Sequence, residues 1–217
     1  MQNAQPTYTP IKDISSNPKT AFRLSTSQKA TITREYADIV DRILVQHFGL
    51  TTQPPLVFNN RLRSAIGKYR MTISYRTHEV IKESIDLQTT AMALSFLDDP
   101  ATGSAFRQNV MAHELVHYAM YKLGKNANDG SADFEQALAD LHIMASGRTN
   151  QHRVISDTDL VYYSRTVTYE REGQPKQINV GNNYKRMQRT LDNLTVLSSV
   201  GKADNIAVAI CRIACTR

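Results

Sequence analysis

Two histidines and a glutamate that lie close together in the sequence have the types and spacing for metal-dependent hydrolysis. They are His113, Glu114 and His117, in the segment Val-Met-Ala-His-Glu-Leu-Val-His-Tyr-Ala-Met-Tyr from Val110 to Tyr121. Residues four apart lie one above the other on a helix, so the two imidazoles aim at one point. Neutral imidazoles suit zinc, whereas magnesium and calcium call for oxygen ligands. The pattern therefore predicts zinc ligands at His113 and His117. Glu114, about 100° around the helix from His113, is the predicted general base toward a zinc-activated water.

The residues around this pattern predict a buried helix. Apart from the His-Glu-x-x-His residues themselves, Val110 to Tyr121 contains no charged side chain. A helix that is apolar on nearly every side is a buried one. Two imidazoles and a carboxylate are costly to bury unless a partner satisfies them, and a metal ion does so directly. The alternative is a pair of core histidines hydrogen-bonded to backbone groups, with Glu114 in a salt bridge.

Together with its flanks, this helix resembles the SprT-like family, which includes the eukaryotic protease Spartan. Bacterial members carry His-Glu-Leu-x-His, then a glycine, a third histidine and Asp-Phe. The matching residues here are His113-Glu114-Leu115-Val116-His117, Gly124, Asp129 in place of the third histidine, and Asp133-Phe134. Upstream, the segments that look like the family's strands are Asn60–Arg63, Gly67–Tyr69 and Ser84–Leu87. The resemblance covers about residues 28–145. It implies a zinc peptidase that acts on proteins, among them proteins attached to DNA, with an affinity for nucleic acid.

The identity of the third zinc ligand is open at this point. A catalytic zinc needs three protein ligands and one open position. Asp129 stands where the family has histidine, and a carboxylate oxygen is an acceptable ligand if the loop approaches the metal closely. The main rival is Glu135 on the following helix; Asp133 and His142 are less plausible, and a degenerate site is the remaining alternative. We take Asp129 as the predicted ligand, although Asp129-Gly130 is also a common turn before a helix.

The elements that must position this helix follow an α+β order. Helical periodicity spans residues 27–48 and 131–146, and the central helix spans about 104–123, with Gly124 as its stop. Strands are predicted at 56–58, 67–75 and 80–87, the second with one half-buried face made of Tyr69, Met71, Ile73 and Tyr75. This order predicts an α+β, zincin-like domain over residues 27–148, in which a small mixed sheet packs on the buried active-site helix. The segment Ile81–Leu87 is the expected edge strand for an extended substrate.

The two ends of the chain carry separate predictions. Residues 1–26 are rich in Pro, Ser, Thr and Asn and predict a flexible leader. Residues 149–217 predict a small C-terminal extension that consists of a β-hairpin and a helix. Many relatives end in a zinc ribbon with two Cys pairs, whereas this chain has only Cys211 and Cys215. We therefore expect both cysteines to be small buried side chains at a degenerate ribbon position, with no second structural metal.

Composition and charge indicate which other partners to expect. With 41% apolar and 21% charged residues and no apolar run that spans a bilayer, the chain has the profile of a soluble protein outside the membrane. Its polar N-terminus lacks a signal-peptide layout, so we expect a cytoplasmic location. Residues 147–217 carry 11 Lys and Arg against 6 Asp and Glu, while residues 1–146 carry 15 against 14. The basic C-terminal region therefore predicts either contact with nucleic acid or a solvated surface that keeps the protein soluble.

Three functions are compatible with the sequence. The leading prediction is a zinc-dependent metallopeptidase that hydrolyses protein or peptide substrates. The second is a catalytically weak or inactive SprT-like scaffold that acts as a nucleic-acid-associated binding or regulatory protein, since the third histidine and a cysteine pair are missing. The third is a structural protein with a fortuitous motif.

Overall fold

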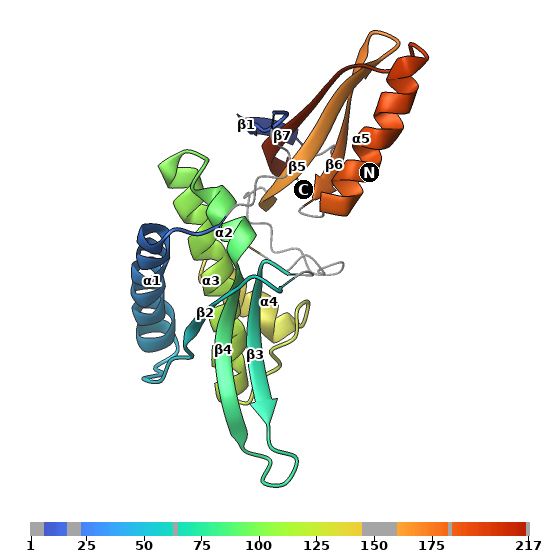
Figure 1. Ribbon diagram of the computed structural model, residues 1–217. Helices are drawn as coiled ribbons and strands as arrows, with labels where there is room; N and C mark the ends of the chain where they lie inside the picture. Colours follow the sequence, from blue (N-terminus) through green and yellow to red (C-terminus); the bar gives the residue numbers. More distant parts are fainter. Residues whose placement is uncertain (1–6, 17–22, 63–64, 145–159, 182–183, 216–217) are drawn as a thin grey trace.

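The protein has an α+β fold in which helices accompany two small sheets (Figure 1), which confirms the predicted fold class. The computed structural model describes residues 7–16, 23–62, 65–144, 160–181 and 184–215. Their elements, in chain order, are β1 (Thr7–Asp13), α1 (Thr26–Val40), the π-helix η1 (Asp41–His47), β2 (Leu56–Asn59), β3 (Gly67–Ile73), β4 (Val80–Gln88), α2 (Thr89–Ser95), α3 (Pro100–Lys122), α4 (Ala132–Asp140), β5 (Leu160–Arg171), β6 (Gln174–Gly181), α5 (Tyr184–Ser199) and β7 (Asp204–Cys215). Within these ranges, no helix is both long and apolar enough to cross a membrane.

The first sheet is small and mixed, as predicted, with the order β2-β4-β3. Strand β2 runs parallel to β4 and pairs with its residues 85–88, and β3 runs antiparallel on the other side. The prediction that Ile81–Leu87 forms the edge strand is therefore wrong for residues 85–87, which pair on both sides, while residues 82–84 pair with β3 alone. The short parallel strand β2 pairs beside β4, so β4 is the central strand and β3 lies on an edge.

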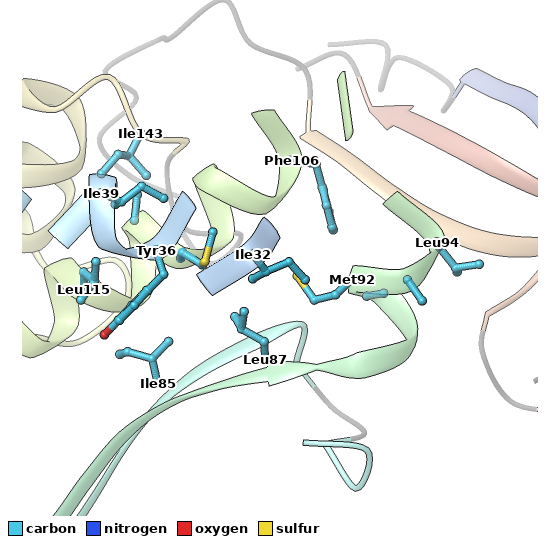
Figure 2. Packing of buried hydrophobic residues seen from close by; sticks show 14 of the residues in the cluster. Ile32, Tyr36, Ile39, Ile85, Leu87, Met92, Leu94, Phe106, Leu115 and Ile143 are labelled. Atoms are coloured by element: carbon cyan, nitrogen blue, oxygen red, sulfur yellow. The ribbon is translucent and has the colours of Figure 1, made fainter. Parts of the chain in front are cut away.

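The core of this part of the chain lies between the first sheet and the helices. Figure 2 shows Ile32 and Tyr36 of α1 facing Ile85 and Leu87 of β4, with Leu115 of α3 close by. All five side chains are at most 5% exposed. Burial of such a side chain is worth roughly 1.5–3 kcal/mol. This contact layer fixes α3, the helix with the His-Glu-x-x-His pattern, against the sheet.

The hairpin between β3 and β4 extends beyond the helices (Figure 1). Tyr69 and Met71 are partly buried, but Ile73 is 40% exposed and Tyr75 is fully exposed. The predicted half-buried face of residues 69–75 is thus confirmed only for its first half, because no helix covers the tip of the hairpin.

Local sequence signals set where α3 begins and ends. The Asp99 side chain accepts a hydrogen bond from the Thr102 N–H at 2.9 Å, and Pro100 occupies the first helical turn. This cap starts the helix at Pro100, four residues before the predicted start at Ser104. Gly124 follows the last turn with a φ of +66°, which confirms its predicted role as the stop.

The second sheet joins strands that are far apart in the chain. Its order is β1-β7-β5-β6, every pair is antiparallel, and α5 packs against it (Figure 1). The predicted hairpin and helix are present as β5, β6 and α5, whereas β7 had not been predicted. The predicted flexible leader is wrong for residues 7–13, because they pair with residues 209–214 of β7 and form β1. Residues 1–6 and 17–22 of the predicted leader lie outside the described ranges, as does the predicted domain boundary at residue 148.

Cys211 lies in β7 as a buried, free thiol. It pairs with Pro10 of β1 and Ser164 of β5, and its burial matches the small buried side chain expected from the sequence. The Cys215 side chain lies outside the described part of the chain.

Candidate metal centre

The centre is built on the middle of α3. His113 and His117 lie one turn apart on this helix, and their ring centroids are 4.9 Å from each other. Both side chains are partly buried, with exposed fractions of 20% and 15%. The helix between and around them is buried, including Ala112, Leu115 and Val116. The sequence spacing therefore brings the two imidazoles together as predicted, on a helix that the core holds in place.

Asp129 reaches this pair from the loop between α3 and α4. Its Oδ1 lies 3.2 Å from His113 Nε2 and 3.4 Å from His117 Nε2. The three ligand atoms lie within 4.8 Å of one another, and among the described residues these three form the group that could hold a metal ion. Tetrahedral zinc with bonds of about 2.0–2.2 Å places neighbouring ligand atoms roughly 3.3 Å apart. The spacing of the carboxylate oxygen from both imidazoles therefore fits a metal ion between them.

The tautomer of His117 supports the same fit. His117 Nδ1 lies 2.6 Å from the Ala127 carbonyl oxygen, which can only accept, so Nδ1 carries a proton. In the neutral ring, Nε2 then presents a lone pair to the Asp129 carboxylate. That contact is repulsive unless the ring is protonated or a cation lies between the two atoms. A backbone carbonyl that binds the far nitrogen is the usual partner of a metal-ligating histidine.

The rival ligands lie outside this group. The Glu135 carboxylate accepts a hydrogen bond from the Gly130 N–H at 2.9 Å, and the Glu135 side chain is buried. Asp133 is exposed in the first turn of α4, and His142 follows the end of that helix. Glu135 thus holds the loop next to Asp129 instead of joining the three ligand atoms. Metal binding by His113, His117 and Asp129 stays a prediction.

Phe134 of α4 forms one wall of the centre. Its fully buried ring stacks on His117, with centroids 4.2 Å apart and an angle of 19° between the planes. It meets His113 edge-on at 5.3 Å. The ring restricts both imidazoles to orientations that face Asp129. The sequence named Phe134 only through the family resemblance, and its contact with both rings was not predicted.

Glu114 points away from the loop and toward the first sheet. It is 8% exposed, and its Oε2 accepts a hydrogen bond of 2.7 Å from the backbone N–H of Tyr69 in β3. Burial raises the pKa of Glu114 and outweighs the opposite effects of His113, His117 and this hydrogen bond. The contact with Tyr69 was not predictable from either segment, because it joins the helix α3 to the strand β3, 45 residues apart in the chain.

The pKa values of His117 and Asp129 depend on the contact between these two side chains. Burial lowers the pKa of His117, but the hydrogen bond that the ring donates to Asp129, the charge of Glu114 and the Ala127 carbonyl outweigh it and raise the pKa overall. Hydrogen bonds from His113 and His117 hold the pKa of Asp129 far below its usual value. A negative charge thus faces two imidazoles, which is the charge arrangement that a divalent cation requires.

Comparison with known proteins gives a partial match. No family model and no solved structure matches the chain. A curated protein is 26% identical over 110 residues, which cover 48% of this chain and 59% of that protein. It is the Protein SprT-like of Bacillus cereus. The similarity to SprT-like is low and is confined to about half of this chain.

Proposed function

We propose that this protein is a zinc-dependent metallopeptidase of the SprT-like, zincin-like kind, which hydrolyses peptide bonds in protein or peptide substrates. The observation that carries the proposal is the convergence of His113, His117 and Asp129 on one point, with all three ligand atoms within 4.8 Å. A buried carboxylate, Glu114, follows the first of these ligands directly on the same helix. The similarity to SprT-like over 110 residues supports the same reading.

Each residue then has a defined task. His113, His117 and Asp129 would hold the zinc ion, which would supply a water of lowered pKa and polarise the carbonyl of the peptide bond. Phe134 and the Ala127 carbonyl keep the two imidazoles in the orientation for binding. Glu114 would take the proton from that water and deliver it to the leaving amine.

The substrate binds as an extended segment along β3. This strand lies on the edge of the first sheet, and its Tyr69 N–H contacts Glu114 directly. An open strand edge offers backbone donors and acceptors to an added strand, which gives affinity with little demand on the substrate's sequence. The proposed substrate strand is therefore β3 and not the segment Ile81–Leu87.

The test is the Glu114→Ala variant, assayed on an unfolded protein substrate with zinc content measured in parallel. General acid–base catalysis is worth about 10²–10⁴-fold, so cleavage should fall by at least about 100-fold while the zinc content equals that of the wild type. The matched control is Glu79→Ala, which removes an exposed carboxylate of the β3–β4 turn and should leave cleavage unchanged. Wild-type cleavage by the Glu114 variant would sink the mechanism.

A second candidate is a binding or regulatory scaffold that is associated with nucleic acid and has little or no activity. Two observations favour it: an aspartate stands at the third ligand position, and residues 147–217 carry 11 basic against 6 acidic side chains. In that case purified protein holds less than about a tenth of an equivalent of zinc and does not respond to added metal. It also binds a fluorescent oligonucleotide with an affinity that falls steeply as salt is raised.

A further inference from the structure

We propose that Gly67 is a positioning residue for Glu114, and that its missing side chain lets the backbone of β3 hold the carboxylate in place. This inference rests on the proposed function, since it assigns a role at the same site. Gly67 begins β3, is buried and pairs with Leu87 of β4. It lies directly over the helix turn that carries Glu114.

The Glu114 side chain fills part of the space beside Gly67. A Cβ atom at this position would lie 2.8 Å from Glu114 Cγ, 2.9 Å from Glu114 Oε1 and 2.8 Å from Val110 Cγ1. Separations below 3.0 Å do not occur for real Cβ atoms, so one of the partners would have to move. Gly67 is not among the glycines with positive φ. The glycine is therefore required by the space next to Glu114 and not by the backbone conformation.

The strand cannot retreat, because Tyr69 anchors it to the same face of α3. The Tyr69 ring lies edge-on to Tyr118, one turn after Glu114, with centroids 5.8 Å apart. The Tyr69 hydroxyl donates to Glu83 Oε1 at 2.7 Å, and Glu83 forms an ion pair of 2.9 Å with Lys122. With β3 fixed in this way, a methyl group on residue 67 must displace the side chains of both Glu114 and Val110.

Displacement of Glu114 has a catalytic cost. Its Oε2 accepts the 2.7 Å bond from the Tyr69 N–H and its Oε1 lies beside Gly67, so a methyl group on residue 67 would reorient the whole carboxylate. A misplacement of about 1 Å in a reacting group costs on the order of 100-fold in rate. Gly67 lies outside the group of His113, His117 and Asp129 that could hold a metal ion, so its substitution leaves those three side chains in place. The expected signature of Gly67→Ala is a fall in kcat of about 100-fold, with KM and zinc content within about twofold of the wild type.

The experiment compares Gly67→Ala with a glycine substitution that is costly for another reason. Gly49 has a φ of +69° with no atom within 4 Å of an added Cβ, so Gly49→Ala strains the backbone without touching Glu114. Gly49→Ala should lower Tm and leave kcat unchanged, whereas Gly67→Ala should lower both. A wild-type kcat in Gly67→Ala overturns the proposal.

Two double variants identify the displaced partner. In Gly67→Ala/Glu114→Ala the methyl group enters the vacated space, so the drop in Tm caused by Gly67→Ala should be much smaller than in the wild-type background. In Gly67→Ala/Val110→Ala the contact with Glu114 persists, so kcat should stay low. Recovery of kcat through Val110→Ala, or an equal Tm drop in both Glu114 backgrounds, overturns the proposal. If Gly67→Ala fails to fold, folding of Gly67→Ala/Glu114→Ala supports it, and failure of both variants overturns it.

These outcomes separate the positioning role from the function on which it rests. The Tm comparison measures the contact between residue 67 and Glu114 in the zinc-loaded and the zinc-free protein and needs no catalysis. Full activity of Glu114→Ala removes the peptidase mechanism whatever the Tm values are. Loss of activity in Glu114→Ala together with full activity in Gly67→Ala keeps the peptidase and removes the role of Gly67.

Discussion

Under the proposed function, removal of the Asp129 carboxylate by Asp129→Ala should abolish most of the stabilisation that added zinc would give to this protein. Asp129 Oδ1 lies 3.2 Å and 3.4 Å from the two imidazole nitrogens, so a bound ion would have the carboxylate as its third ligand without any rearrangement of the loop. Without that oxygen, His113 and His117 alone hold the ion. The measurement is the melting temperature of each variant as zinc is added, followed by circular dichroism or calorimetry.

The magnitude follows from mass action. At a free zinc concentration of 100 times the wild-type Kd, binding stabilises the folded state by about 2.7 kcal/mol. For a chain of 150–250 residues this raises Tm by roughly 5–11 °C. Loss of an outer-shell partner already weakens binding by about 10–100-fold, and a lost ligand costs at least as much. A 100-fold weaker site gives only about 0.4 kcal/mol at the same zinc concentration, or roughly 1–2 °C.

Two matched carboxylates separate the third ligand from a general charge effect. Asp133→Ala removes an exposed carboxylate four residues further on, and its zinc-induced rise in Tm should equal that of the wild type. Glu135→Gln removes a charge but keeps an oxygen for the Gly130 N–H, so it should lose less than Asp129→Ala. A full zinc response in Asp129→Ala, or its loss in Glu135→Gln alone, would refute the assignment of Asp129.

Two further results are expected at the same centre. Phe134→Ala should destabilise the protein by about 3–5 kcal/mol, since its ring is fully buried. It should also weaken zinc binding by about 10–100-fold, since the ring packs against both imidazoles. Unchanged zinc affinity in a calorimetric titration would contradict this second expectation. Zinc binding should weaken by about tenfold per pH unit as pH falls below the pKa of His117, because a protonated ring cannot ligate. Since the pKa of His117 is raised, the decline in zinc affinity should begin above the usual value of about 6.5. Chelator competition from pH 5.5 to 8.5 measures the zinc affinity. An affinity that is constant down to pH 6 would contradict the assignment of His117.

The local parts of this structure were predictable because their signals lie within single segments. The spacing of His113 and His117 belongs to one helix, and a periodic apolar pattern together with Gly124 identifies that helix. The short strands around Leu56, Tyr69 and Ile85 were also predicted, since each alternates or is continuously apolar. Only the ends of the elements were misplaced, as at Pro100, where a cap extends the helix.

The parts that depend on contacts between distant segments were not predictable. The segment Thr7–Asp13 contains a proline and several polar residues, so it has no strand signal of its own and becomes a strand only through β7. The order of the first sheet likewise depends on where the four-residue strand β2 pairs. At the centre, the family resemblance pointed to Asp129, but its approach to both imidazoles and the role of the Ala127 carbonyl required the fold of the loop.

Strand β7 is the last strand in chain order, yet it lies inside its sheet between β1 and β5. A hydrogen bond between Ser15 and Val208 spans 193 residues of chain. During synthesis, β1 therefore leaves the ribosome long before its partner exists, and the α1–α4 segment has time to fold in between. Any nascent or truncated chain that ends before residue 204 leaves Thr7–Asp13 without its partner and one edge of β5 unpaired, and such an edge is a template for aggregation. A chaperone that binds Thr7–Asp13 until β7 has been synthesised would therefore protect the nascent chain.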